Sequence, residues 1–381
     1  MKKILILHNK YIAKGGEDIA VQREIELLKE KYIVKELIFD NKDTGILNTL
    51  IIFLTNSNFR VNKIIKNTLN DFQPNYVYIH NTWFTISLQI FKILFKKGIP
   101  VYLKIHNFRY NCTNSHLSKN HFINIDFCQA CGNNKSNIGW YNMYFESLLK
   151  SIFVNRYGKK YFKILSNPLV TLLVLTNFHK EFLINQNFNE KNIKVLPNFL
   201  EVKNKSNSNE IGNTLVYAGR ISKEKGVEGI ITTFLQSSLK LTKLHLIGDG
   251  PELDYLKEKY SSNRVIFNGS LDNEKVLKYI ASSKAVISNT LLYEGQPTLL
   301  CEATMLNRVS IFPKNGGIEE FFNDDYFFKF NSKNHENLLE KLESLSDNEL
   351  LKNESRKAKK HIESILSKEL ILNKFEEIFL D

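Results

Sequence analysis

The sequence predicts an α/β protein with two Rossmann-like, doubly wound domains that face each other across a cleft. Three observations lead to this prediction: the length of 381 residues, a series of short apolar runs, and one polar stretch that divides the series in two. A chain of this length is too long for one ordinary hydrophobic core and suits two domains of roughly 150 to 200 residues each. Apolar runs that end in Gly, Asn or His and lead into a helical pattern are typical of βα units in a parallel sheet.

The apolar runs are predicted to be buried strands. In the first half they are KKILILH, YVYIHN, PVYLKIHN, TLLVLT and IKVLPN. In the second half they are TLVYAGR, KLHLIGDG, RVIFNGS, AVISNT and VSIFPKNGG. Ligands of parallel sheets bind at the carboxyl ends of the strands, so the residues that follow each run are the first candidates for a site.

The polar stretch NFLEVKNKSNSNEIGN is rich in Asn and Ser and is the best candidate for a linker. We therefore predict a first domain at 1–199, a linker at 200–212 and a second domain at 213–365. The last residues, 366–381, are predicted to form a C-terminal helix that packs back on the first domain.

The bulk composition describes a folded, cytoplasmic protein. A hydrophobic content of 43% and an aromatic content of 12% exclude a disordered chain. The apolar run after Lys2 and Lys3 is too short for the centre of a signal peptide, and no run is long enough for a transmembrane helix. In the cytoplasm the four cysteines are expected to be reduced.

The net charge of +12 belongs to the first half of the chain. Residues 1–200 carry 27 Lys and Arg against 13 Asp and Glu, whereas residues 201–381 carry 25 against 27. Residues 51–200 alone have 18 basic and 5 acidic side chains. Such a surplus on one domain indicates an anionic partner, which is nucleic acid, an anionic membrane surface or a phosphorylated lipid.

Two cations follow the first predicted strand of the second half. In YAGRISKEKG, Arg220 comes directly after the strand and Lys225 follows before Gly226. Cations at a strand end, beside a tight turn and the start of a helix, suit a pyrophosphate. Taken alone, the segment fits a solvated basic loop equally well.

The segment YEGQPTLLCEA at 293–303 contains two acids, one before and one inside a predicted helix. Pro297 suits the first turn of a helix that runs through Thr298 to Met305, and the free amides of that turn would form an anion site. Glu302 is placed to accept hydrogen bonds from a ribose diol, and Glu294 to reach a sugar or its leaving phosphate oxygen. An isolated segment of this kind fits a capping acid and a buried, paired Glu better. Together with the two cations in the same domain, it fits a nucleotide-sugar site.

The order GRISKEKG, LIGDGP, EGQPTLLCEA and GG resembles that of the retaining glycosyltransferases of family four, which have the GT-B fold. Their Glu-x7-Glu motif matches Glu294 and Glu302, and their paired Arg and Lys match Arg220 and Lys225. The first half also resembles this family: HNKYIAKGGEDIAVQREIELL is similar to its first strand, Gly-Gly loop and helix, and VYLKIHN to the strand that ends in its active-site histidine. The resemblance covers nearly the whole chain.

The resemblance implies roles for residues in both domains. In the second domain, which would bind the nucleotide-sugar, Arg220 and Lys225 neutralise the donor diphosphate and Glu302 holds the ribose. Other donor-binding positions implied in this way are Gly295, Gln296, Pro297 and Thr298, and Gly15 and Gly16 in the first domain. Gln296 is expected to contact the sugar, because relatives vary at this position.

In the first domain, which would bind the acceptor, the resemblance makes His106 a catalytic-site residue beside Glu294. A lone histidine at a strand end is more often a packing residue. Because His106 matches the position of the family's active-site histidine, the resemblance favours a catalytic-site role over packing. His106 need not be a general base, because the departing phosphate oxygen can take the acceptor proton. His8, His80 and Asn81 also follow predicted strands and are weaker candidates.

Neither a metal ion nor a cofactor is expected for the reaction, and the donor is a UDP- or GDP-sugar that acts as substrate. Departure of a nucleoside diphosphate leaves negative charge that two cations and a helix N-terminus stabilise. No Asp-x-Asp motif lies in a suitable place, and NDDY at 323–326 is more simply a turn.

The cysteines raise a separate question. Cys112, Cys128 and Cys131, with His116 and His121 between them, have a spacing that suits a structural zinc site. Three reduced, unliganded thiols explain the same residues.

A segment at 140–165 mixes aromatic and apolar residues with lysines. It fits peripheral contact with the anionic inner face of the cytoplasmic membrane, as well as an ordinary amphipathic core helix. Membrane contact would bring the enzyme to a glycan acceptor linked to polyprenyl diphosphate. The pathways expected are lipopolysaccharide O-antigen, capsule or exopolysaccharide synthesis.

Two other functions compete with a transferase. One is a basic nucleic-acid-binding protein with a zinc element, but the chain shows no recognisable binding module and its second half is net acidic. The other is a non-catalytic GT-B scaffold, against which the intact Arg220, Lys225, Glu294 and Glu302 count. We therefore expect no nucleic-acid partner.

Overall fold

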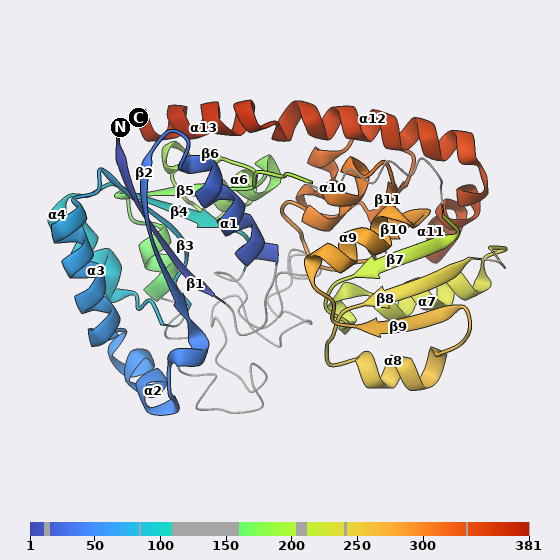
Figure 1. Ribbon diagram of the computed structural model, residues 1–381, viewed down its shortest axis with the longest axis horizontal. Helices are drawn as coiled ribbons and strands as arrows, with labels where there is room; N and C mark the ends of the chain where they lie inside the picture. Colours follow the sequence, from blue (N-terminus) through green and yellow to red (C-terminus); the bar gives the residue numbers. More distant parts are fainter. Residues whose placement is uncertain are drawn as a thin grey trace. The chain divides into compact units, whose positions relative to one another are not determined.

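The computed structural model describes residues 1–10, 16–83, 85–108, 160–202, 212–239, 242–332 and 334–380. These residues form two compact units (Figure 1). The first unit consists of Met1–Phe199 together with Lys368–Asp381, and the second consists of Leu200–Ser367. Each unit is built on one six-stranded parallel sheet.

The sheet of the first unit has the strand order β2-β1-β3-β4-β5-β6. From β1 the chain moves outward to β2 and then returns to the other side of β1 with β3, so the order reverses between β1 and β3. Ligands of open α/β sheets bind beside such a reversal, at the carboxyl ends of the strands. The strands are β1 (Lys3–Lys10), β2 (Ile33–Asp40), β3 (Tyr76–Asn81), β4 (Val101–Ile105), β5 (Val170–Val174) and β6 (Ile193–Val195).

The inner strands of this sheet are buried on both faces. Residues 4–7 of β1 have no exposed surface, and every residue of β4 is buried. Continuous burial is typical of parallel strands, because their crossover helices cover the sheet. The helices of this unit are α1 (Gly16–Leu28), α2 (Ile46–Thr55), α3 (Phe59–Phe72), α4 (Gln89–Lys97), α6 (Asn177–Ile184) and α13 (Lys368–Leu380).

The C-terminal helix α13 belongs to the first unit and packs on its sheet (Figure 1). The ring of Phe379 stacks on that of Tyr76, with 5.3 Å between the centroids, and meets the ring of Tyr102 edge-on at 4.7 Å. The hydroxyl of Tyr102 donates a hydrogen bond to the carbonyl oxygen of Ile378 at 3.1 Å. The end of the chain therefore completes the core of the unit in which the chain begins.

The sheet of the second unit has the strand order β12-β11-β10-β7-β8-β9, which reverses between β7 and β10. Its strands are β7 (Thr214–Ala218), β8 (Lys243–Ile247), β9 (Val265–Gly269), β10 (Ala285–Ile287), β11 (Val309–Pro313) and β12 (Lys329–Phe330). Its helices are α7 (Val227–Gln236), α8 (Leu253–Tyr260), α9 (Asn273–Ala281), α10 (Thr298–Met305), α11 (His335–Glu343) and α12 (Asn348–Leu366). The predicted class, two doubly wound α/β units, is confirmed.

Among the described residues, no helix is both long enough and apolar enough to cross a lipid bilayer.

Candidate functional site

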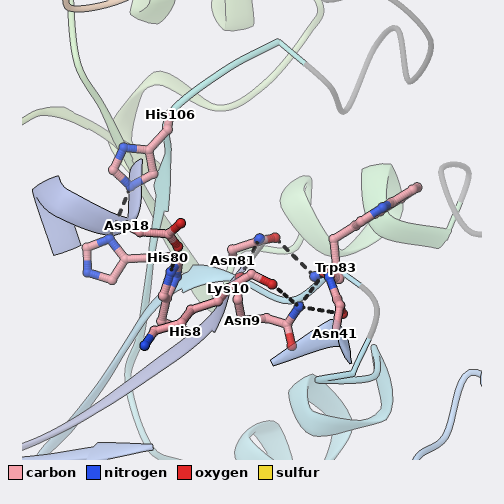
Figure 2. A network of polar contacts seen from close by, with 9 residues as sticks. All are labelled: His8, Asn9, Lys10, Asp18, Asn41, His80, Asn81, Trp83 and His106. Carbon is pink, nitrogen blue, oxygen red and sulfur yellow. Dashed lines mark hydrogen bonds and ion pairs between the residues drawn. The ribbon is translucent and has the colours of Figure 1, made fainter. Parts of the chain in front are cut away.

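Three histidines lie together at the carboxyl ends of neighbouring strands in the first unit (Figure 2). His8 is near the end of β1, His80 near the end of β3, and His106 directly follows β4. Because β1, β3 and β4 are adjacent in the sheet, their ends meet at one edge. We call His8, His80 and His106 the histidine cluster.

His80 and His106 are joined by a direct contact, with 3.1 Å between Nδ1 of His80 and Nε2 of His106. His80 is 3% exposed, whereas His106 is partly exposed. Burial is the main cause that lowers the pKa of both histidines well below the usual value, and neighbouring positive charge, that of Lys104 included, adds to the effect. Both rings are therefore neutral at pH 7.

Glu24, on the inner face of α1, lies behind His80. Its carboxylate forms an ion pair with Lys104 of β4 and accepts a hydrogen bond from the hydroxyl of Tyr78 at 2.7 Å. Its Oε2 atom is 3.8 Å from Nε2 of His80. Glu24, Tyr78 and Lys104 have no exposed surface. Burial lowers the pKa of Lys104, and burial together with the Glu24 carboxylate raises that of Tyr78.

His8, the third member of the cluster, contacts Asp18 in the first turn of α1, with 2.8 Å between Nε2 and Oδ1. The helix itself begins at Gly16. A Cβ atom on Gly16 would meet nothing within 4 Å, so packing does not require glycine there. Gly15 lies outside the described residues, and the predicted donor-binding role of both glycines stays a prediction.

An asparagine network holds the ends of β1 and β3 (Figure 2). The side-chain amide of Asn9 donates to Oδ1 of Asn41 at 2.7 Å, and that of Asn81 donates to the carbonyl oxygen of Asn9 at 2.8 Å. Asn41 in turn donates to the carbonyl oxygen of Trp83 at 2.9 Å. These bonds fix the strand ends that carry His8 and His80.

In the second unit, most of the residues predicted to bind the donor lie on the two loops that flank the reversal between β7 and β10, and the other two, Thr298 and Glu302, lie on α10. We call residues 219–226 the β7 loop and residues 288–297 the β10 loop. The backbone amide of Leu291 donates to the carbonyl oxygen of Glu224 at 2.8 Å. The side-chain amide of Asn289 donates to the carbonyl oxygen of Gly226 at 3.1 Å. The two loops are therefore one hydrogen-bonded structure.

An ion pair joins the two loops. The ammonium group of Lys225 contacts Oε1 of Glu294, and the hydroxyl of Thr290 donates to the same oxygen at 2.9 Å. The side chains of Lys225 and Glu294 are 26% and 29% exposed, so a ligand can reach both. Arg220 is exposed on the β7 loop. The structure thus brings together Lys225 and Glu294, which are far apart in the sequence.

The backbone at Glu294 is held by the segment that follows β11. The amide of Gly317 donates to the carbonyl oxygen of Glu294 at 2.9 Å. The side-chain amide of Asn315 donates to the carbonyl oxygen of Leu292 at 2.5 Å. Gly316 has a φ of 68°, and a Cβ atom on it would lie 2.8 Å from the carbonyl oxygen of Glu294. Glycine is required here by both the left-handed backbone and the close approach.

Helix α10 spans Thr298–Met305 as predicted, but Pro297 is the residue that precedes the helix and does not lie in its first turn. The first amides of a helix have no acceptor within it, and here the amide of Thr298 donates to the carbonyl oxygen of Gln296 in the β10 loop at 3.0 Å. Glu302 lies one turn further in and is 3% exposed, and Gln296 is 9% exposed. Gly295, Gln296 and Pro297 therefore lie between the Lys225–Glu294 pair and the amino end of a helix, which is a suitable place for an anion.

Two further glycines explain the LIGDGP motif. Cβ atoms on Gly248 and Gly250 would lie 1.9 Å from the carbonyl oxygen of Gly219 and 2.2 Å from that of Ile221. The β7 loop runs directly against this motif, because the amide of Ile221 donates to the carbonyl oxygen of Asp249 at 2.9 Å. Side chains at these positions would displace the loop that carries Arg220.

The second unit also has a pocket of about 510 Å³ beside α7 and α11. Gly226, Glu228 and His335 are among its lining residues, and the predicted donor-binding residues of this unit are not. Lys223 of the β7 loop and Asn289 and Leu291 of the β10 loop also line it, so the pocket adjoins the two loops.

Comparison with known proteins decides the class of the second unit. Residues 198–362 match the family described as "Glycosyl transferases group 1". The second unit carries a group 1 glycosyltransferase domain. This match confirms the prediction that the chain is a glycosyltransferase. No curated protein matches the chain.

Solved structures show that the whole glycosyltransferase chain has the GT-B fold. Sucrose-phosphate synthase from Thermosynechococcus elongatus is 14% identical with a TM-score of 0.73, over 100% of this chain and 98% of that one. Anabaena HepE in complex with UDP and glucose is 15% identical with a TM-score of 0.67, over 99% of each chain. The lipopolysaccharide outer core galactosyltransferase WaaB is 14% identical with a TM-score of 0.62, also over 99% of each chain. The predicted GT-B fold is confirmed.

Two parts of the glycosyltransferase chain that carried predictions lie outside the described residues. These are the cysteines Cys112, Cys128 and Cys131 with their neighbouring histidines, and most of the aromatic segment at 140–165. The zinc site and membrane contact by that segment stay predictions. Sequence reasoning missed Glu24 and Lys104, although each leaves a signal: an acid on the apolar face of a helix and a lysine in an apolar strand.

Proposed function

We propose that the chain is a retaining, metal-independent glycosyltransferase of family four that moves a sugar from a UDP- or GDP-sugar to a glycan acceptor. The observation that carries this proposal is the Lys225–Glu294 pair at the sheet reversal, directly before the amino end of α10. A cation and a helix N-terminus at one strand edge suit a diphosphate. A carboxylate beside them suits the hydroxyl groups of the attached sugar.

The donor diphosphate would displace Glu294 as the ion-pair partner of Lys225. A diphosphate carries more negative charge than one carboxylate, and Arg220 on the same loop adds a second, bidentate donor. Glu294, released from the lysine, would then accept hydrogen bonds from the sugar, and Gln296 would contact it as well. Glu302, buried one turn into α10, would hold the ribose hydroxyls.

The transfer breaks the bond between the anomeric carbon and the phosphate oxygen and forms a bond from that carbon to the acceptor oxygen. The acceptor proton passes to the departing phosphate oxygen, which lies on the same face of the sugar, so the anomeric configuration is retained. Arg220, Lys225 and the α10 dipole stabilise the charge left on the diphosphate. NMR of the product reports the anomeric configuration, and an inverted product would contradict a retaining mechanism.

In this proposal the protein's own positive groups stabilise the charge on the departing diphosphate, which a divalent cation does in other transferases. No cofactor is therefore needed. Turnover should therefore survive exhaustive treatment with EDTA. A loss of activity that Mg²⁺ or Mn²⁺ restores would contradict metal independence, and metal analysis of the purified protein would test the separate zinc prediction.

The names of similar structures support the choice of substrates. HepE was solved with UDP and glucose, and TarM, 18% identical over 83% of this chain and 58% of that one with a TM-score of 0.59, with UDP and α-GlcNAc-glycerol. WaaB is named as a lipopolysaccharide galactosyltransferase. For the present chain we propose a nucleotide-sugar donor and an acceptor linked to polyprenyl diphosphate, in O-antigen, capsule or exopolysaccharide synthesis.

A lipid-linked acceptor calls for contact with the inner face of the cytoplasmic membrane, where we place the protein. Besides the basic surplus, apolar side chains are exposed on α2 and α3: Leu50, Leu54 and Phe59 are 43%, 54% and 74% exposed. Exposed apolar residues with nearby cations suit an anionic bilayer surface. Flotation with anionic vesicles in rising salt tests this proposal, and a protein that never floats with them contradicts it.

Donor binding is tested by thermal shift with UDP, GDP and their sugars, because a ligand of the folded state raises the melting temperature. Ligand at a hundred times its Kd should stabilise the second unit by about 2.7 kcal/mol. Lys225→Ala and Arg220→Ala should abolish the shift while the protein stays folded. Lys223→Ala is the matched control, since Lys223 is an exposed cation of the same loop outside the Glu294 pair. An unchanged shift in Lys225→Ala would overturn the assignment.

A further inference from the structure

The buried ion group of the first unit has no part in the donor chemistry described above. It consists of Glu24, Lys104 and Tyr78, which have no exposed surface and are brought together by α1, β4 and β3. Charges are expensive to remove from water and are retained only where they are paired and hydrogen-bonded. Here the Lys104 ammonium and the Tyr78 hydroxyl both contact the Glu24 carboxylate, so each buried polar group has a partner.

His80 lies between this carboxylate and His106 (Figure 2 shows the two histidines). Its Nε2 atom is 3.8 Å from Oε2 of Glu24, and its Nδ1 atom is 3.1 Å from Nε2 of His106. A neutral imidazole carries its proton on one nitrogen only. A proton on Nε2 faces the anionic carboxylate, whereas a lone pair there would be repelled by it. Glu24 therefore favours the His80 tautomer with N–H at Nε2.

The tautomer of His80 fixes that of His106. With its proton on Nε2, His80 has a lone pair on Nδ1 and can only accept a hydrogen bond from His106. His106 must then carry its proton on Nε2, and its own lone pair is on Nδ1, the ring nitrogen that is not bonded to His80. The low pKa of both rings agrees with this arrangement, because a charged ring would donate from both nitrogens.

We propose that His80, oriented by Glu24, is a positioning residue that keeps His106 as the Nε2–H tautomer, so that Nδ1 of His106 accepts a hydrogen bond from a substrate hydroxyl. Because Nδ1 of His106 accepts, its ligand must be a hydrogen-bond donor. It is a hydroxyl of the transferred sugar or of the acceptor, and not a phosphate oxygen, which needs a donor. The ligand assignment rests on the proposed transferase function, whereas the tautomer assignment rests on the first unit alone.

The tautomer is measured directly by ¹⁵N NMR of the histidine side chains in the ligand-free protein. We expect His106 to show an unprotonated Nδ1 and a protonated Nε2, with the His106→Gln variant identifying its signals among those of the nine histidines. His106 found mainly with its proton on Nδ1 would overturn the proposal. This measurement needs no substrate and no substitution of His80.

Two variants of His80 separate positioning from packing. In His80→Asn the side-chain oxygen occupies the place of Nδ1 and can still accept from His106. In His80→Gln the amide reaches the place of Nε2, near Glu24, and leaves no acceptor at Nδ1. We expect His80→Asn to keep the tautomer and most of kcat, and His80→Gln to lose the tautomer and roughly tenfold or more in kcat. Equal losses in both variants at equal melting temperatures would overturn the positioning role.

Nucleotide binding distinguishes this proposal from the proposed function. UDP or GDP binds the loops of the second unit, so both His80 variants should show the thermal shift of the wild type. A wild-type protein that binds neither nucleotide would refute the proposed function and leave the NMR result to decide the tautomer. If both variants fail to fold, the wild-type NMR spectrum decides alone.

Discussion

At the scale of single residues, Glu24 organises the polar interior of the first unit. Its carboxylate contacts Lys104 and Tyr78 and faces His80, so three elements depend on one buried charge. A buried ion pair is weak evidence for stability by itself, but the removal of one partner leaves an uncompensated charge. Removal of one of the two charges should therefore destabilise this unit much more than replacement of both.

Lys104→Met should destabilise the first unit strongly, because Glu24 then keeps only the Tyr78 hydroxyl. We expect a loss of about 3 to 5 kcal/mol in the free energy of unfolding, measured with urea. The double variant Lys104→Met with Glu24→Gln removes both charges and should recover most of that loss. If the single and double variants are equally stable, the two charges do not interact in the folded chain.

The buried histidines make the first unit sensitive to acid. His179 has no exposed surface, and burial lowers its pKa from 6.5 to about 3. Below pH 6.5 the unfolded chain binds protons that the folded chain does not, so stability is complete above that pH and falls as the pH drops toward 3. At pH 5 the loss for His179 is about 2 kcal/mol. Unfolding in urea at pH 7 and pH 5 should show this decrease, and His179→Phe should reduce it.

At the scale of elements, two sets of contacts hold the loops that carry the predicted donor residues. The β7 loop is held against Gly248 and Gly250, and the β10 loop against Asn315 and Gly316. None of these contacts involves the side chains of Arg220, Lys225 or Glu294. The loops are therefore fixed before any ligand arrives, which spares part of the ordering cost of binding.

Gly316→Ala tests whether the β10 loop must be held in this position. The added Cβ would lie 2.8 Å from the Glu294 carbonyl oxygen, so the loop should shift and UDP binding should weaken. Gly98→Ala is the control, because Gly98 has a similar φ of 65° but open space around it. Both variants should lose roughly 1 to 2 kcal/mol from left-handed strain, but only Gly316→Ala should lose nucleotide binding. Equal binding in the two variants would contradict this role of Gly316.

The elements with continuous apolar runs could be predicted from the sequence, as could the start of α10 at Thr298. The edge strands β2 and β12 could not. Lys35 and Glu36 interrupt the apolar run of β2, which is partly exposed, and β12 has only two residues. Lys225 and Glu294 were predicted to share a site by resemblance, and the structure shows their contact. Glu24 and Lys104 were missed, because only tertiary packing places them on facing elements.

At the scale of the whole molecule, the chain crosses from the second unit back to the first at its C-terminus. Helix α12 ends at Leu366 within the second unit, and α13 begins at Lys368 within the first. The first unit is therefore built from both ends of the chain, and it is complete only when residues 368–380 are present. The second unit is continuous in sequence. This asymmetry predicts that damage to α13 affects only one unit.

Phe379→Ala should destabilise the first unit and leave the second unchanged. Phe379 is 1% exposed and its ring packs on those of Tyr76 and Tyr102, so truncation should cost about 3 to 5 kcal/mol. Leu380→Ala is the matched control, since the neighbouring Leu380 is 74% exposed and its truncation should change the stability by less than about 0.5 kcal/mol.

Calorimetry with and without UDP identifies the transition of the second unit as the one whose temperature the nucleotide raises. In Phe379→Ala the other transition should move to lower temperature while the UDP-sensitive one stays in place. A single transition that moves as a whole would show that the two units unfold together, and that the C-terminal helix stabilises both.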